Sequence, residues 1–201
     1  MTISTPWGTP DDEIVYAEGV TFYRTPSHGG FWLDHERNAK LHPLLRESSG
    51  WYEEDCAWSK VVFTFPELFS EKDREAALAT VKHWYPDAYE AITGVALRPG
   101  ESLVKDERRF KKAHVDDWVV ISAIRSDRHP GMVECAATGG GARPAIAERH
   151  YLVPENEYAR SGRFGFVIDE ARHAFRDGPD AMEVEPREEQ EPGRERASRE
   201  G

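Results

Sequence analysis

Cysteine is scarce in this chain of 201 residues, which contains only Cys56 and Cys135. Two cysteines are too few for a disulfide framework or a cysteine-based zinc finger. Long apolar runs are also missing: the longest cover a few residues, such as 61–63, well short of a membrane span. The first residues lack the basic region and apolar run of a secretory signal. These absences predict a cytoplasmic protein without membrane association, and the sequence assigns it no metal and no cofactor.

Positive charge is in deficit, with 26 Lys and Arg against 37 Asp and Glu and a formal net charge of -11. An acidic surface repels phosphate backbones, so direct nucleic-acid binding is disfavoured. One basic cluster departs from this average and is formed by Lys105, Arg108, Arg109, Lys111 and Lys112. This cluster leaves a nucleic-acid-binding regulator as the weakest functional hypothesis. Acidic residues surround it, which favours a solvated connecting segment instead.

The first half of the chain reads as mainly helical. Turn residues dominate residues 1–19, which predicts an irregular N-terminal segment before a strand at 20–24. Residues 51–65 fit a helix with an acidic first turn, although a strand at 60–65 competes with that interpretation. Further helices are expected after the N-cap residues Asp34 and Ser70, and another is expected to begin at Pro86 and end at Gly94.

After residue 100 the hydrophobic pattern changes from helical to alternating. Strands are expected at residues 118–124, 132–138, 147–153 and 163–168. The fold class predicted is therefore α+β, with a helical N-terminal half packed on a mostly antiparallel sheet from the C-terminal half. A single domain should span residues 1–178, since six tryptophans and a hydrophobic fraction of 39% suffice for a core. The acidic tail, 179–201, should be disordered.

Residues 25–58 contain the densest set of chemically capable side chains. In an enzyme, Cys56 would be the nucleophile and Glu53 or Asp55 the group that orients a histidine base. The candidates for that base are His28, His83, His114 and His150, and the sequence does not choose among them. The three acidic residues beside Cys56 oppose its ionisation, and a free cysteine is more often a small buried hydrophobe. No catalytic residue is therefore assigned, and a Cys56-dependent hydrolase or transferase is the alternative hypothesis.

Three histidines recur at intervals of seven residues: His28, His35 and His42. Gly29, Gly30 and Pro43 rule out the continuous helix that would align them, so no metal site is predicted. His28, in a tight glycine turn, is the best single polar candidate for a binding surface. The full set of candidate binding residues is Ser27, His28, Trp32, Trp51, Tyr52, Glu53, Glu54 and Asp55. The aromatic residues also permit a homodimer.

Several sequence motifs mark a resemblance: TPSHGGFWLDHERN, GWYEEDCAW with the downstream FPELF, and ERHYLVPENEY with GRFGFVID. On these motifs, most of residues 5–178 resembles an uncharacterised domain-of-unknown-function family carried on conjugative plasmids, integrative elements and phages of proteobacteria. The resemblance transfers no catalytic residue. It implies, by genetic association, a role in protecting a mobile element from host defence.

The functional expectation is therefore a non-enzymatic accessory protein of a mobile genetic element. Such a protein would act as an anti-CRISPR or anti-restriction factor. It would bind a host defence protein or nuclease complex through its acidic surface, since an acidic protein can occupy a basic nucleic-acid channel by charge complementarity.

Overall fold

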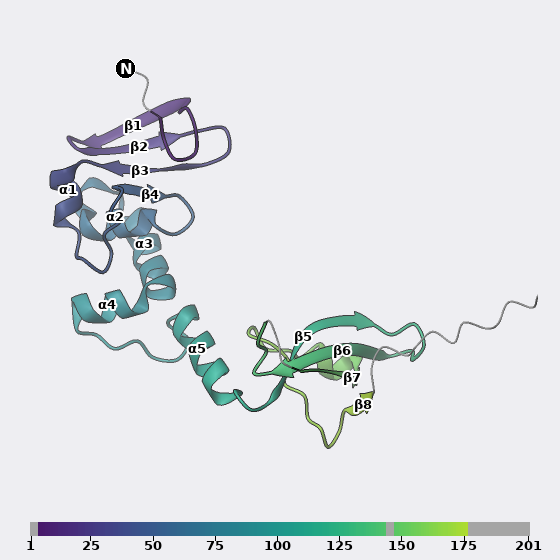
Figure 1. The fold of residues 1–201 in the computed structure, drawn as a ribbon. Helices are drawn as coiled ribbons and strands as arrows, with labels where there is room; N and C mark the ends of the chain where they lie inside the picture. The colour runs from purple at the N-terminus through teal and green to yellow at the C-terminus, as the bar shows by residue number, and fades with distance from the viewer. Residues whose placement is uncertain (1–3, 144–146, 177–201) are drawn as a thin grey trace, which may run out of the picture. The chain divides into compact units, whose positions relative to one another are not determined.

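The computed structural model of the protein describes residues 4–143 and 147–176 (Figure 1). The chain divides into two compact units, Met1–Ala113 and His114–Gly201, and each contains one four-stranded sheet. The single domain over residues 1–178 stays a prediction. The predicted disordered tail, residues 179–201, lies outside the described residues.

The sheet of the first unit has four antiparallel strands in the spatial order β1-β2-β3-β4. Their bounds are β1 Asp12–Ala17, β2 Val20–Arg24, β3 Gly29–Leu33 and β4 Trp51–Glu53. The turn between β2 and β3 is closed by Thr25, whose hydroxyl donates to the carbonyl of His28 and accepts from its N–H. β1 and β4 are therefore the two edges of this sheet.

The helices of the first unit largely follow local capping signals. They are α1 His35–Lys40, α2 Trp58–Thr64, the 3-10 turn η1 Pro66–Leu68, α3 Glu71–Trp84, α4 Pro86–Thr93 and α5 Leu103–Ala113. Asp34 caps α1 by accepting from the N–H of Arg37, and Ser70 caps α3 by accepting from the N–H of Asp73. Gly94 ends α4 in the left-handed conformation, at φ 71°. These three expectations from the sequence are confirmed.

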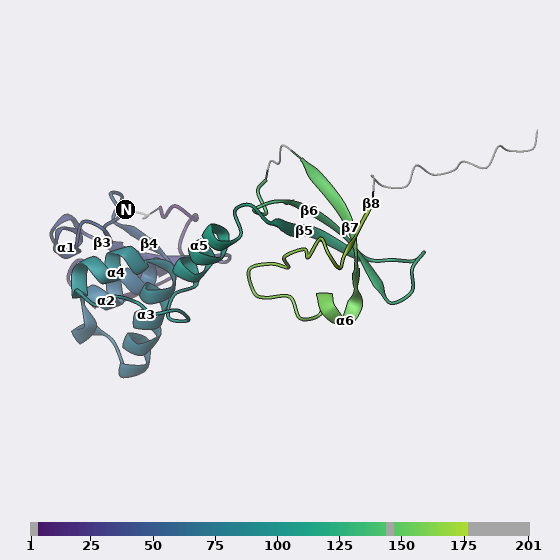
Figure 2. The same ribbon diagram turned by 90° about the horizontal axis from the view of Figure 1, so that it is seen from below.

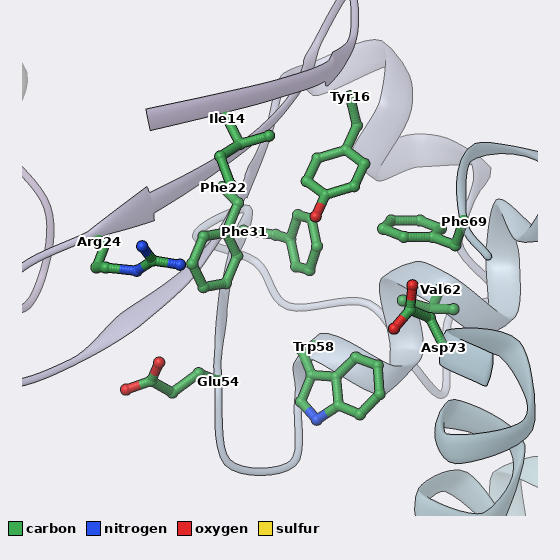
Figure 3. A pocket seen from close by; sticks show the side chains of 10 residues that line it. All are labelled: Ile14, Tyr16, Phe22, Arg24, Phe31, Glu54, Trp58, Val62, Phe69 and Asp73. Atoms are coloured by element: carbon green, nitrogen blue, oxygen red, sulfur yellow. The ribbon is translucent and has the colours of Figure 1, made fainter. Parts of the chain in front are cut away.

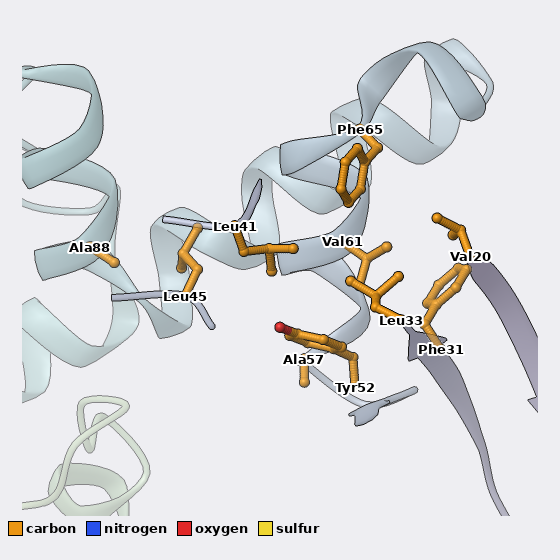
Figure 4. Packing of buried hydrophobic residues seen from close by; sticks show 10 residues of the cluster. All are labelled: Val20, Phe31, Leu33, Leu41, Leu45, Tyr52, Ala57, Val61, Phe65 and Ala88. Carbon is orange, nitrogen blue, oxygen red and sulfur yellow. The ribbon is translucent and has the colours of Figure 1, made fainter. Parts of the chain in front are cut away.

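The hydrophobic core of the first unit lies between α2 and one face of the sheet, here called the inner face (Figure 4). Leu33 and Tyr52 of the sheet and Val61 of α2 are almost completely buried in it. On the opposite, outer face, the indole of Trp7 packs edge-on against Trp51, with ring centroids 5.8 Å apart.

The second unit is built on an antiparallel sheet in the order β5-β6-β7-β8. Its elements are β5 Trp118–Arg125, β6 Met132–Gly139, β7 Glu148–Pro154, the short helix α6 Glu155–Tyr158 and β8 Ala174–Arg176. Figure 2 shows α6 directly after β7. The first three expected strands are confirmed, but the fourth, at 163–168, is wrong: that segment makes isolated bridges only, and β8 completes the sheet.

The predicted fold class requires correction, because the N-terminal half is not helical. Strands β1–β4 lie in the N-terminal part, helices occupy the middle of the chain, and the second sheet lies in the C-terminal part. Within the segment 1–19 that was expected to be irregular, residues 12–17 form β1. The helix predicted over 51–65 is wrong in its first half, where residues 51–53 pair with β3. The errors at residues 12–17 and at residues 51–53 have one physical cause. Strand pairing joins residues distant in sequence, so signals from neighbouring residues do not reveal it.

Candidate functional site

Cys56 lies in an environment that keeps its thiol protonated. Burial raises the pKa of this thiol, and the carboxylates of Glu53 and Asp55 raise it further, against a smaller opposite effect of Lys60. No histidine is among these influences. The described residues also include no group of three or more His, Cys, Asp or Glu side chains arranged to hold a metal ion. Burial and the two carboxylates therefore oppose formation of the thiolate, the reactive form of a cysteine nucleophile.

We expect iodoacetamide to alkylate Cys56 several-fold more slowly at pH 7 than it alkylates an unperturbed thiol, because a raised pKa leaves less thiolate. Cys135 is an internal comparison: burial raises its pKa to about 12, so it should react only on unfolding. Mass spectrometry of peptides from a time course measures both rates. Alkylation of Cys56 faster than that of free cysteine would restore the thiol-enzyme hypothesis.

Glu53 stabilises the turn before α2. One of its carboxylate oxygens accepts from the N–H groups of Cys56 and Ala57, at 2.9 and 3.0 Å, and the other accepts from the N–H of Asp55 at 2.5 Å. Partial burial alone would raise the pKa of Glu53, but the three donors and the charge of Lys60 outweigh it, so its pKa is lowered. Both oxygens of this carboxylate are thus engaged in hydrogen bonds to backbone N–H groups, which is a structural role.

The other predicted binding residues are buried to three different degrees. Tyr52 is fully buried, and its hydroxyl donates to Asn38 at 2.6 Å and accepts from the N–H of Glu47 at 3.0 Å. Trp32 and Trp51 are half-buried. The remaining members of the set are exposed at the surface: Ser27, His28, Glu54 and Asp55. The imidazole Nδ1 of His28 lies 3.8 Å from the carboxylate of Glu54, so these two residues are neighbours.

Glu54 belongs to a concave site that we call the aromatic groove (Figure 3). It has a volume of about 280 Å³. It is lined by Ile14, Tyr16, Phe22, Arg24, Phe31, Glu54, Trp58, Val62, Phe69 and Asp73. This volume is slightly below the range of small-molecule pockets, about 300–1,000 Å³, and suits individual side chains of a larger partner.

Strand register brings the floor of the groove together. Ile14 of β1 pairs with Phe22 of β2, which pairs with Phe31 of β3, so three apolar side chains form a row on the inner face. Phe69, after η1, extends this row: its ring lies 4.8 Å from that of Tyr16 and 5.6 Å from that of Phe31. The row remains open to solvent at β1, where Ile14 is 42% exposed and Tyr16 is 37% exposed.

Charged side chains mark the ends of the aromatic groove. Figure 3 shows Arg24 and Glu54 at one end and Phe69 and Asp73 at the other. Arg24 lies 3.8 Å from Asp12, so its charge is partly compensated by its own sheet. Asp73 accepts a hydrogen bond from the hydroxyl of Ser70 at 2.6 Å. The rim is therefore acidic on balance.

Most of the groove was missed by reasoning from the sequence, which named only Glu54 among the ten lining residues. Ile14 and Tyr16 fell in the segment expected to be irregular, although their spacing of two residues is the signal of a strand face. Phe69 and Asp73 come from a different part of the chain. Only strand pairing and side-chain packing bring these residues together in the groove.

Four of the five basic side chains in the cluster on α5 form ion pairs with neighbouring carboxylates. Its ion pairs are Lys105–Glu90, Arg108–Asp87, Arg109–Asp106 and Lys111–Glu107. Guanidinium and ammonium groups paired in this way are poorly placed to bind phosphates, so this cluster gives the nucleic-acid hypothesis no support.

In a comparison with known families, the model of a domain of unknown function, DUF7007, matches residues 1–115. The chain belongs to this family. The match ends far short of the residue 178 that the motifs indicated, and it supplies no taxonomic or mobile-element context. The aromatic groove lies wholly within the DUF7007 domain. No curated protein and no solved structure matched the chain. In the described part of the chain, no helix has both the length and the apolar character needed to cross a membrane.

Proposed function

We propose that this DUF7007 protein is a non-enzymatic binding factor whose aromatic groove holds apolar side chains of a partner protein. The observation that carries the proposal is the concave apolar row of Ile14, Phe22 and Phe31, whose β1 end is left open to solvent in the described part of the chain, where Ile14 and Tyr16 are exposed. Exposed apolar surfaces bordered by polar groups mark interaction sites.

The state of the reactive side chains supports a binding role over a chemical one. The carboxylate of Glu53 is occupied by backbone donors, and the pKa of Cys56 is raised. The groove itself contains three charged groups, Arg24, Glu54 and Asp73, and no nucleophile paired with a base. This set can orient a partner but has no evident means of activating a substrate.

The partner we propose is a host defence protein, which the protein would inhibit on behalf of a mobile element. The formal charge of -11 and the acidic rim of the groove favour a basic partner surface, such as the nucleic-acid channel of a nuclease. Complexes of this type weaken as salt rises, because the charges are screened over about 8 Å at physiological ionic strength.

Phage plaquing in cells that carry a restriction or CRISPR system tests this function. Expression of the protein should raise plaquing efficiency, and Ile14→Ser should remove about 90% or more of that gain, since it places a hydroxyl on the apolar floor. Ile124→Ser is the matched control: Ile124 is a strand residue of the second unit, 64% exposed, and its substitution should change nothing. Unaltered restriction across several defence systems would remove the support for an anti-defence role.

A further inference from the structure

The edge strand β1 leaves one side of its backbone without a partner strand in the described part of the chain. Its one neighbour in the sheet is β2, and the described residues place no other strand against its far side. In an edge strand, about half of the backbone N–H and C=O groups point away from the sheet. The strand contains no proline and no lysine, two common protections against pairing with another chain.

The regular part of this edge is short. Pairing with β2 runs in register from Asp12 to Val15 and then shifts at Tyr16, so the bulge limits an added strand to about four residues of ladder. β4, the opposite edge, contains only three residues and contacts α2. Of the two edges, β1 is therefore the one suited to pairing.

An added strand would place side chains at the mouth of the aromatic groove. Strands in a sheet lie about 4.8 Å apart, and alternate side chains share a face. Every second side chain of a strand beside β1 would therefore lie on the inner face, next to Ile14 and Tyr16 and within reach of Phe69. The edge and the groove thus form one continuous surface for an extended segment.

Charge determines which extended segment fits. Residues 11–18 contain four acidic residues, Asp11, Asp12, Glu13 and Glu18, and no basic residue. A second copy of β1 would bring four more acidic residues against them, and like charges opposed across strands destabilise pairing. A basic segment would instead meet opposite charge at both ends of the edge, at residues 11–13 and at Glu18.

We propose that β1 takes up an extended, basic segment of the partner protein as an additional strand, with one apolar side chain of that segment in the aromatic groove. The inference rests on the proposed binding function and names its mode and the chemistry of the partner. Backbone hydrogen bonds supply pairing, the groove selects an aromatic or aliphatic side chain, and the acidic edge selects lysine or arginine.

The test uses the full chain and a fluorescein-labelled peptide, Lys-Val-Lys-Phe-Lys-Val-Lys, with binding followed by fluorescence anisotropy. The same peptide with glutamate in place of lysine should bind at least about tenfold more weakly. Two further peptides carry N-methyl groups on alternate residues, one set for each edge of the peptide strand. One set should reduce affinity about tenfold or more and the other should leave it unchanged, because a strand pairs through one edge.

Protein variants complete the design. Glu13→Lys should weaken peptide binding about tenfold by reversing charge on the edge, whereas Glu75→Lys, the same change on the exposed surface of α3, should have no effect. No binding of the lysine peptide, equal binding of the glutamate peptide, or indifference to both N-methyl sets would each overturn strand addition. A dimer of the wild-type chain in sedimentation that the lysine peptide dissociates would also overturn it, in favour of a second copy as the occupant of the edge. None of these outcomes tests the proposal that the aromatic groove binds a partner. That proposal would be contradicted separately, by an Ile14→Ser variant that retains full anti-defence activity.

Discussion

Replacement of Gly30 by alanine should destabilise the first unit by about 3 kcal/mol. A β-carbon at this position would lie 2.3 Å from the ring of Trp7 and 2.5 Å from the carbonyl oxygen of Tyr52. The carbonyl belongs to the neighbouring strand and cannot move without breaking the β3–β4 ladder, in which Gly30 pairs with Glu53. The ring of Trp7 would have to leave the outer face, together with its contact with Trp51.

Urea unfolding followed by tryptophan fluorescence measures this effect, since Trp118 alone of the six tryptophans lies outside the first unit. The matched control is Gly139→Ala. Gly139 ends β6 with an ordinary φ, and a β-carbon there would have no neighbour within 4 Å. This variant should be neutral or slightly stabilising, because alanine reduces the entropy of the unfolded chain. Equal stability of the Gly30 and Gly139 variants would show that Trp7 is not packed as described.

Replacement of Glu53 by alanine should cost about 2–3 kcal/mol, because three backbone N–H groups lose a charged acceptor. The N–H of Ala57 is the most affected, since Ala57 is buried and water reaches it poorly. Asp55→Ala removes the same charge from the adjacent exposed turn and should change stability by less than about 0.5 kcal/mol. Glu53→Gln should lie between the two, because the amide oxygen still accepts but the charge is lost.

The same carboxylate makes stability depend on pH. The pKa of Glu53 is lower in the folded protein than its ordinary value of 4.5, so the unfolded chain binds a proton more readily. Its contribution is therefore fully present above pH 4.5 and is lost as pH falls through the folded-state pKa. The difference in stability between wild type and Glu53→Gln should therefore shrink as pH falls below 4.5 and disappear below the folded-state pKa. A difference that grows as pH falls below 4.5 would contradict the assignment.

Local signals in the sequence predicted the helices with caps. Ser70 and Asp73 satisfy the first turn of α3 from within four residues, and Gly94 ends α4 because it adopts positive φ without strain. The long alternating run at 118–124 likewise predicted β5. Each of these elements depends on residues a few positions apart, so the sequence alone predicts it.

The candidate site was poorly predicted because its parts are distant in sequence. Glu53–Glu54–Asp55 has the composition of a helix start, but Glu53 bonds the turn before α2 and the helix begins only at Trp58, without a side-chain cap. Tyr52 was expected at the surface, yet the pairing of β4 with β3 turns its ring into the core. A one-residue change of register would reverse that orientation, and composition does not determine register.

The sequence by itself determined the excess of negative charge, the capped helices and the first three strands of the second unit. The tertiary structure alone decided that β1 is a strand at a sheet edge and that Ile14, Phe31 and Phe69 share an open groove. The reason is that caps and periodicity act over one or two turns of chain. Strand pairing and side-chain packing join segments far apart in the sequence, and only the folded chain specifies which segments meet.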